Sequence, residues 1–229
     1  MIRRIVLSIL VAFGALAAVA AAPAQAAVTC PPNPAPGTTI TDSIEVPPGT
    51  TCTLTGVTVV GSVAVARTGV LITKDAVVQG DVNVVGGNAK LEGGSVGGFV
   101  VLNDAPRFRI CNLKVNGDLV IENRVTPPSG DVLPACTEPD ETLIKGNVVL
   151  QNNALPVSGG GPVQGNLVIS GNTAPINFGH GQIRDNGTIA NNTALVRVLN
   201  TNFGGVLSCS NNTPRPDLTG TTALAINCP

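Results

Sequence analysis

The chain contains no tryptophan and no tyrosine, and it has a single histidine, His180, and few charged side chains. Without tryptophan or tyrosine it lacks the large amphipathic rings that would stack on a sugar. Basic residues form no run, so nothing predicts a nucleic-acid partner. One histidine and no Cys-x-x-Cys spacing argue against zinc. The sequence therefore predicts neither a metal site nor a cofactor.

Helical periodicity is missing after the first residues, where the sequence has the pattern of a secretory signal peptide. Arg3 and Arg4 precede an apolar run over 5–22, and Ala24-Gln25-Ala26 matches a small-residue cleavage site. A retained membrane anchor is the alternative, because a run of this length could just span a bilayer. The cleavage site favours removal. We therefore predict a signal peptide over 1–26 and a secreted, extracellular or cell-wall-associated mature chain that has no membrane segment.

A short motif that opens with glycine recurs through the rest of the chain. Its copies are separated by steps of 19, 18, 19, 29, 19, 22 and 18 residues, and they begin at Gly61, Gly80, Gly98, Gly117, Gly146, Gly165, Gly187 and Gly205. A fixed period near 19 residues is typical of a repeat architecture. Three short strands per period, separated by glycine, asparagine or proline, indicate the coil of a parallel β-solenoid.

These periods predict an all-β fold, a single-stranded parallel β-helix of about nine coils of roughly 19 residues each. The helix covers residues 44–229 and follows a Pro-rich lead-in over 27–43, which we expect to form an extended cover without regular pairing. We predict a right-handed helix, because a left-handed hexapeptide helix would need stricter six-residue repeats. The long step of 29 residues indicates a loop inserted over 126–139.

Two positions in the motif are apolar in nearly every copy, and alternation turns both toward the interior. We expect their side chains to stack on their counterparts in neighbouring coils. Two residues after the glycine come Val63, Val82, Val100, Leu119, Val148, Leu167, Ile189 and Leu207, and four residues after it come Val65, Val84, Leu102, Ile121, Leu150 and Ile169.

The position between these two columns should face outward, and in four successive coils it is valine: Val101, Val120, Val149 and Val168. Other coils carry Glu45, Ala64, Asn83, Ala190 or Ser208 there. A contiguous apolar stripe on a surface marks a contact site more often than scattered valines do. One interpretation is contact with a protein or cell-envelope partner, or self-association. The other is that the inserted loop or the lead-in covers the stripe.

Asparagine recurs where the first strand of each coil ends, at Asn103, Asn123, Asn153, Asn172, Asn192 and Asn212. Asparagine tolerates the left-handed turn conformation and can hydrogen-bond its neighbour in a stacked ladder. We interpret the row as structural turns; a ligand-binding row is the alternative.

The six cysteines, all beyond the signal, predict three disulfides in an exported chain. Cys209 and Cys228 are one coil apart, so neighbouring strands would hold them within bonding distance. We expect Cys30 to pair with Cys52 and tie down the lead-in. We expect Cys111 to pair with Cys136 and fix the inserted loop.

The coil pattern over 44–228 resembles the secreted bacterial right-handed parallel β-helix proteins of pectate-lyase-like architecture. That resemblance implies calcium-binding carboxylates and a basic catalytic residue on one face. Asp81 and Asp118 occupy equivalent motif positions, but Phe99 on the intervening coil separates them. Residues 61–84 also resemble the coils of bactofilins, which are cytoplasmic polymers without disulfides, and this likeness implies the coil type alone.

The sequence favours a secreted, non-catalytic structural, adhesive or envelope-associated protein. A polysaccharide-active lyase or hydrolase is the alternative. A pair of acid and base converging in one groove would support the enzyme, whereas a bare valine stripe would support binding.

Overall fold

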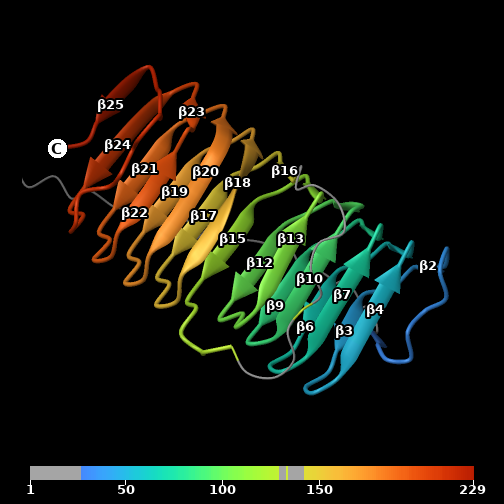
Figure 1. The fold of residues 1–229 in the computed structure, drawn as a ribbon. Helices are drawn as coiled ribbons and strands as arrows, with labels where there is room; N and C mark the ends of the chain where they lie inside the picture. The colour runs from blue at the N-terminus through green and yellow to red at the C-terminus, as the bar shows by residue number, and fades with distance from the viewer. Residues whose placement is uncertain (1–26, 129–132, 134–141) are drawn as a thin grey trace, which may run out of the picture.

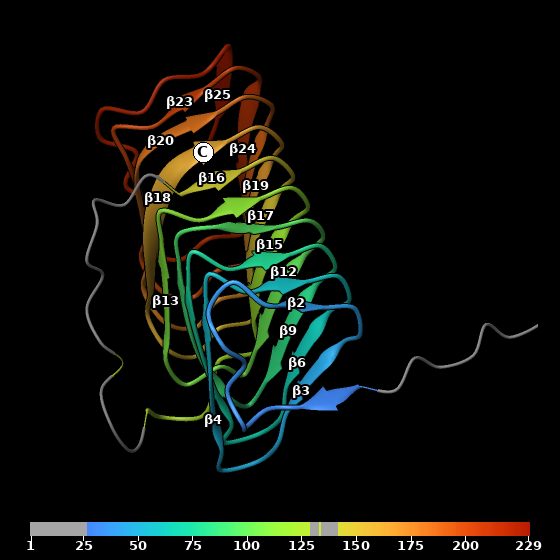
Figure 2. The same ribbon diagram turned by 90° about the vertical axis from the view of Figure 1, so that its right-hand side faces the viewer.

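The computed structural model describes residues 27–128, 133 and 142–229, and in this part of the chain it contains strands and no helix. The predicted signal peptide lies outside the described residues. The strands wind into an elongated stack of parallel turns (Figure 1). Seen from its N-terminal end, the chain turns clockwise as it recedes, so the helix is right-handed (Figure 2).

Three sheets form the walls of the stack, and in the described part of the chain their paired strands run parallel. The long sheet consists of β1 (Val28–Thr29), β3 (Ile44–Val46), β6 (Val63–Val65), β9 (Val82–Val85), β12 (Val100–Asn103), β15 (Leu119–Glu122), β17 (Val148–Gln151), β19 (Leu167–Ser170), β21 (Gly187–Ala190), β24 (Val206–Ser210) and β25 (Ala225–Asn227).

The second sheet consists of β2 (Thr39–Ile40), β5 (Thr58–Val59), β8 (Val77–Val78), β11 (Ser95–Val96), β14 (Lys114–Val115), β16 (Leu143–Ile144), β18 (Val157–Val163), β20 (Ile176–Ile183), β22 (Val196–Leu199) and β23 (Asn202–Phe203). The short sheet consists of β4 (Thr51–Thr55), β7 (Val70–Lys74), β10 (Asn88–Glu92) and β13 (Phe108–Cys111).

The helix begins earlier than the sequence analysis placed it. Within the Pro-rich lead-in, β1 pairs with β3 and β2 pairs with β5. Asn33 also accepts a hydrogen bond from the backbone N–H of Thr53 at 2.9 Å. The lead-in therefore adds a turn to the stack, which has about ten turns rather than nine.

The predicted interior columns form the core. Leu119, Val148 and Leu167 are register partners on neighbouring parallel strands, and all three are buried. One assignment was wrong: Gly187, not Ile189, pairs with Leu167, and Ile189 pairs with Ile169 in the other column. Gly187 is an interior residue rather than a motif glycine. A β-carbon there would come within 2.5 Å of the Phe203 ring, which fills the space.

The motif glycines lie at a corner where successive turns approach closely. A β-carbon on Gly80 would lie 2.7 Å from the carbonyl oxygen of Gly61, and one on Gly117 would lie 2.6 Å from that of Gly98. Both distances are shorter than real contacts of this kind. Glycine recurs at this position because a side chain on these residues would clash with the preceding turn.

Asparagine stacks in a buried ladder near a second corner. The side-chain amide of Asn153 donates to Asn172 Oδ1 at 3.0 Å, Asn172 to Asn192 at 2.9 Å and Asn192 to Asn212 at 2.8 Å. The structural interpretation of the row is correct for these four. Asn103 and Asn123 belong to other columns: Asn103 lies within β12, and Asn123 has a positive φ of 54° in the turn position before the ladder.

Two of the predicted disulfides are present. Cys30 bonds to Cys52 with Cα atoms 5.4 Å apart, and Cys209 bonds to Cys228 with Cα atoms 4.5 Å apart. The first ties the lead-in to β4, and the second ties the last strand of the long sheet to β24. Cys136 lies outside the described residues, so its pairing with Cys111 stays a prediction.

Candidate binding surfaces

The four valines predicted to form a stripe lie side by side on the outer face of the long sheet. Val101 pairs with Val120, Val120 with Val149, and Val149 with Val168, and all four are partly exposed. At its ends the stripe meets Asn83 and Thr188. Thr188 thus takes the place that the sequence analysis gave to Ala190.

Polar side chains border this valine stripe on both sides. On one side the Glu122 carboxylate accepts hydrogen bonds from Asn103 at 3.1 Å and from Gln151 at 2.6 Å. On the other side Asn147 donates to Asp118 Oδ1 at 3.0 Å, and Asn166 donates to Asn147 at 2.9 Å. These ladders hold their side chains away from the valines, so the stripe is a flat apolar band between two ordered polar rows.

The carboxylates considered for a catalytic or calcium site are engaged separately. Asp81 accepts a hydrogen bond from the backbone N–H of Phe99 at 2.8 Å, and Asp118 accepts from Asn147. Phe99 stands between them on the intervening coil, as the sequence indicates. Among the described residues, no cluster of three histidine, cysteine or acidic side chains could hold a metal ion.

The tightest acid–base pair in the described chain was not anticipated. On β10, Lys90 Nζ lies 2.5 Å from Glu92 Oε2, and both side chains are almost fully buried. The signal for it was the Lys-Leu-Glu alternation, which places both residues on one face of a strand. Because the two charges neutralise each other in a buried position, the pair is suited to a structural role.

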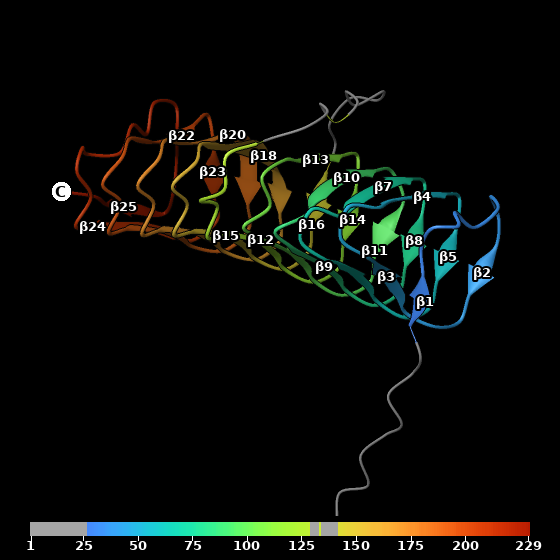
Figure 3. The ribbon, with the colours of Figure 1, turned by 90° about the horizontal axis from the view of Figure 1, so that it is seen from below.

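A different feature breaks the regularity of the stack: in the turn between β15 and β16, no described residue forms a strand of the short sheet. Within residues 27–128 and 142–229 the short sheet ends at β13, which pairs with β10 alone. Its face resumes at β18, β20 and β22 (Figure 3). Between β14 and β18 the second sheet contains the single strand β16, so the break is one strand wide.

The missing strand has a cause in the sequence. Counting from Leu119 as from Val100 in the previous turn, Pro127 and Pro128 occupy the place of the β13 residues that begin at Phe108. Proline has no N–H to donate and is not tolerated in a central strand. Both prolines are exposed instead of lying in the sheet. The predicted inserted loop begins at this point, and most of it lies outside the described residues.

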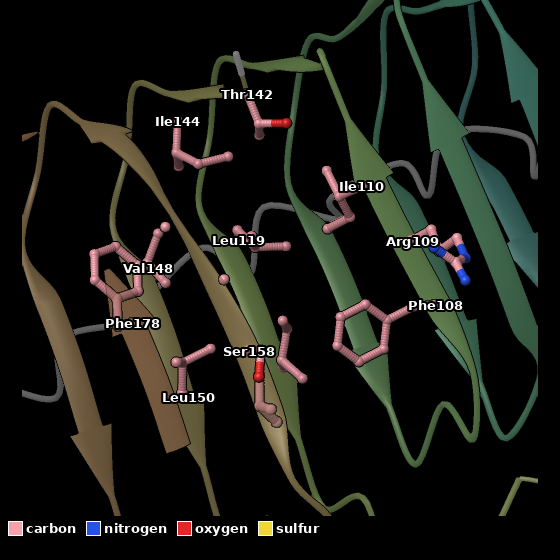
Figure 4. A pocket seen from close by; sticks show the side chains of 14 residues that line it. Phe108, Arg109, Ile110, Leu119, Thr142, Ile144, Val148, Leu150, Ser158 and Phe178 are labelled. Carbon is pink, nitrogen blue, oxygen red and sulfur yellow. The ribbon is translucent and has the colours of Figure 1, made fainter. Parts of the chain in front are cut away.

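A cavity of about 270 Å³ lies where the strand is missing (Figure 4). Its floor is formed by interior residues of the long sheet, including Leu119, Ile121 and Leu150. Phe178 lines one side because Gly159, its register partner on β18, has no side chain to cover it. A β-carbon on Gly159 would meet no atom within 4 Å. The core is therefore open at this face of the stack.

One buried arginine bridges the turns on both sides of the break. Arg124 Nε and Nη2 donate to the carbonyls of Ala105 at 3.0 Å and Pro106 at 2.9 Å in the preceding turn, and Nη1 donates to Pro156 in the following turn. Its guanidinium also lies 5.0 Å from the centre of the Phe108 ring. Burial lowers the pKa of Arg124, and the Asp104 carboxylate opposes that shift.

Asp104 anchors the chain where it leaves the stack. Its carboxylate accepts hydrogen bonds from the backbone N–H of Val125 at 3.1 Å and of Thr126 at 2.9 Å, and from the Thr126 hydroxyl at 2.7 Å. Burial acts to raise the pKa of Asp104, but these bonds and the positive charge of Arg67 outweigh it, so the pKa is lowered below 3.8. Asp104 is therefore suited to remain ionised while it accepts these hydrogen bonds.

No family model, no curated protein sequence and no solved structure matches this chain. None of these comparisons confirms the resemblance of the coil pattern to pectate-lyase-like proteins or to bactofilins. No helix within residues 27–128, 133 or 142–229 is long and apolar enough to cross a membrane.

Proposed function

We propose that this chain is a secreted, non-catalytic structural protein of the cell exterior that associates with itself or with an envelope protein through the valine stripe. The stripe carries the proposal. Four neighbouring strands present Val101, Val120, Val149 and Val168 in register on an outer face, between rows of polar residues. An apolar band with a polar rim is the usual anatomy of a protein contact.

Two further observations support export. The first 26 residues have the order of a signal peptide: positive charge, apolar run and small-residue cleavage site. One disulfide lies at each end of the stack. Disulfides persist mainly in oxidising compartments. No observation on the described residues favours the lyase or hydrolase alternative, and we do not propose it.

The stripe is tested by placing charge in its centre. We expect Val149→Asp and Val168→Asp to abolish self-association measured by light scattering, or partner capture from cell-wall extracts. Contact through the stripe would bury the new carboxylate without a partner, and burial of an unpaired charge is strongly unfavourable. Thr188→Asp adds the same charge one strand beyond the stripe, and it should behave as wild type. If both valine variants are secreted and associate as wild type does, the proposal is wrong.

A further inference from the structure

We propose that the break between β13 and β18 is a binding slot for one extended peptide strand of a partner protein. Such a strand would enter the wall of the helix parallel to its neighbours and complete the short sheet. This slot opens on a different face from the valine stripe, and the inference stands independently of the proposed function. The inference rests on the direction of backbone hydrogen-bonding groups at the slot edges, on the cavity in the core and on the charge beside it.

The backbone of both edges is directed into the slot. The carbonyls of Arg107 and Cys111 accept hydrogen bonds from β10, so the odd-numbered residues of β13 face that strand. Alternation turns the N–H and C=O groups of Phe108 and Ile110 toward the break. On the far side Val157 donates to Pro175 in the next turn, and alternation turns Ser158 toward the break.

These two edges are one strand apart, and both run in the same direction. Parallel strands lie about 4.8 Å from each neighbour, so edges separated by one missing strand are about 9.6 Å apart. A single extended segment in the slot can hydrogen-bond to both edges at once, whereas a segment that adds to an ordinary sheet edge bonds to one strand. Its central residue would donate to the Phe108 carbonyl and accept from the Ile110 N–H. The residues before and after it would bond with Ser158.

The interior residues on both sides of the slot indicate which side chains of the incoming strand would fit. Phe108 and Ile110 point inward from β13 and pack only partly against the core. The inward positions across the break are Val157 and Gly159. The first inward side chain of the guest would lie between Phe108 and Val157, where a branched aliphatic group fits. The second would lie beside Gly159 and Phe178, where the empty volume suits a large aromatic group.

The charge of Arg109 favours an acidic residue of the guest strand between its two inward-facing residues. The central side chain of the guest would point outward, beside the exposed Arg109 on β13 and the exposed Ser158 on β18. An acidic side chain can pair with the Arg109 guanidinium and accept the Ser158 hydroxyl. The slot therefore fits an extended partner segment with the order branched aliphatic, acidic, large aromatic. This is strand addition, in which main-chain bonds give affinity and alternate pockets give specificity.

The experiment uses the mature chain and a fluorescein-labelled probe, Thr-Thr-Val-Glu-Phe-Thr-Thr, in an anisotropy titration. A second probe has the same sequence with N-methyl groups on the Glu and Phe amides, which removes two strand hydrogen bonds and keeps every side chain. We expect saturable binding of the first probe and at least tenfold weaker binding of the second. Equal binding of both probes, or of neither, overturns the proposal.

Gly159→Leu fills the cavity from within the chain and provides the matched test. Gly159 has no positive φ and its β-carbon position is open, so the variant should fold and melt no lower than wild type. It should bind the first probe at least tenfold more weakly. Ser208→Leu adds the same side chain to an exposed position of the long sheet and should bind as wild type does.

Two results with Gly159→Leu would assign the slot to another occupant and overturn the proposal. A lower melting temperature would show that the variant displaces a segment of the chain's own that fills the slot. Loss of a concentration-dependent dimer would show that a second copy of the chain fills it. Unchanged binding of the first probe would show that the peptide binds elsewhere.

Discussion

The side-chain amide of Asn172 donates to Asn192 Oδ1 at 2.9 Å, while Asn172 Oδ1 accepts both the backbone N–H and the amide of Asn153 at 3.0 Å. A second bond, from the Asn172 amide to the Leu150 carbonyl at 2.9 Å, completes its set. Asn172 is fully buried, so each of these groups depends on the ladder and not on water. The ladder joins four turns by bonds that are independent of the sheets.

Asn172→Ala should therefore destabilise the protein strongly. The substitution leaves two donors of Asn153 buried without partners, and each such group costs about 1–3 kcal/mol. Asn192 Oδ1 keeps the hydrogen bond from the backbone N–H of residue 172 at 3.0 Å. We expect a loss of about 3 kcal/mol or more in the free energy of unfolding, measured by urea denaturation. Asn177→Ala, on the outer face of β20, should cost less than about 0.5 kcal/mol. Equal effects of the two substitutions would contradict the structural role of the ladder.

Replacing both Cys209 and Cys228 by serine should loosen the end of the stack. The disulfide closes a loop of 19 residues, which is worth about 3 kcal/mol in the chain-entropy model. Because β25 has a neighbour on one side only, hydrogen exchange should accelerate at the amides of β24 and β25 first. Amides of β9 and β12, which lie several turns away, are the internal control. Uniform acceleration along the chain would show that the bond acts on global stability instead.

Acid should release the chain at Asp104. The pKa of Asp104 is lowered in the folded state, so its carboxylate stabilises the fold above the unfolded-state pKa and loses that contribution as pH falls through the folded-state pKa. The relevant window is below about pH 4. Asp104→Asn keeps an acceptor oxygen and tolerates the positive φ of 48°, but it carries no charge.

We therefore expect wild type to be more stable than Asp104→Asn near neutral pH, by about 1–2 kcal/mol. Hydrogen bonds to a charged group contribute about 1.5–3 kcal/mol, whereas those between neutral groups contribute about 0.5–1.5 kcal/mol. The difference should shrink below pH 4. Melting temperatures of both proteins across pH 2–7 measure it. A difference that stays constant with pH would show that the charge of Asp104 contributes nothing.

Arg124→Lys should destabilise the protein although it keeps the charge. Three nitrogens of the guanidinium donate to carbonyls in two different turns, and a lysine ammonium cannot span that geometry. We expect a loss of about 2–4 kcal/mol, since buried carbonyls lose their donors. Arg184→Lys, at an exposed position, should change stability by less than about 0.5 kcal/mol. Urea denaturation compares the two, and a neutral result at Arg124 would contradict the bridging role.

Much of the fold could be predicted because a solenoid repeats its constraints. Each turn buries two side chains of its long-sheet strand between the same neighbours, so the columns through Leu119 and through Ile121 were visible in the sequence. The prediction of the columns failed where one turn departs from the repeated motif. Asp185 replaces the corner glycine in one copy, and the next glycine, Gly187, was mistaken for it although it belongs to the interior.

The surfaces were predicted unevenly. Alternation along a strand was sufficient to place Val149 beside Val168, because parallel register follows from the period. The slot was missed, although Pro127 and Pro128 stand where a strand should begin. A missing strand becomes a cavity only if the following turn does not close over it. Whether the cavity stays open depends on the missing side chain of Gly159 and on the hydrogen bonds of Arg124 to two other turns. Such relations between turns cannot be read from the sequence of one repeat.

The glycine corner has a consequence for how such a molecule can change. Because successive turns lie so close together there, most turns have glycine at this corner, and Asp185 is an exception. New sequence therefore leaves the stack more readily at the remaining corners, as it does after Thr126. The length of the rod can vary only in whole turns, so duplication or loss of one period would alter its reach and leave its cross-section unchanged.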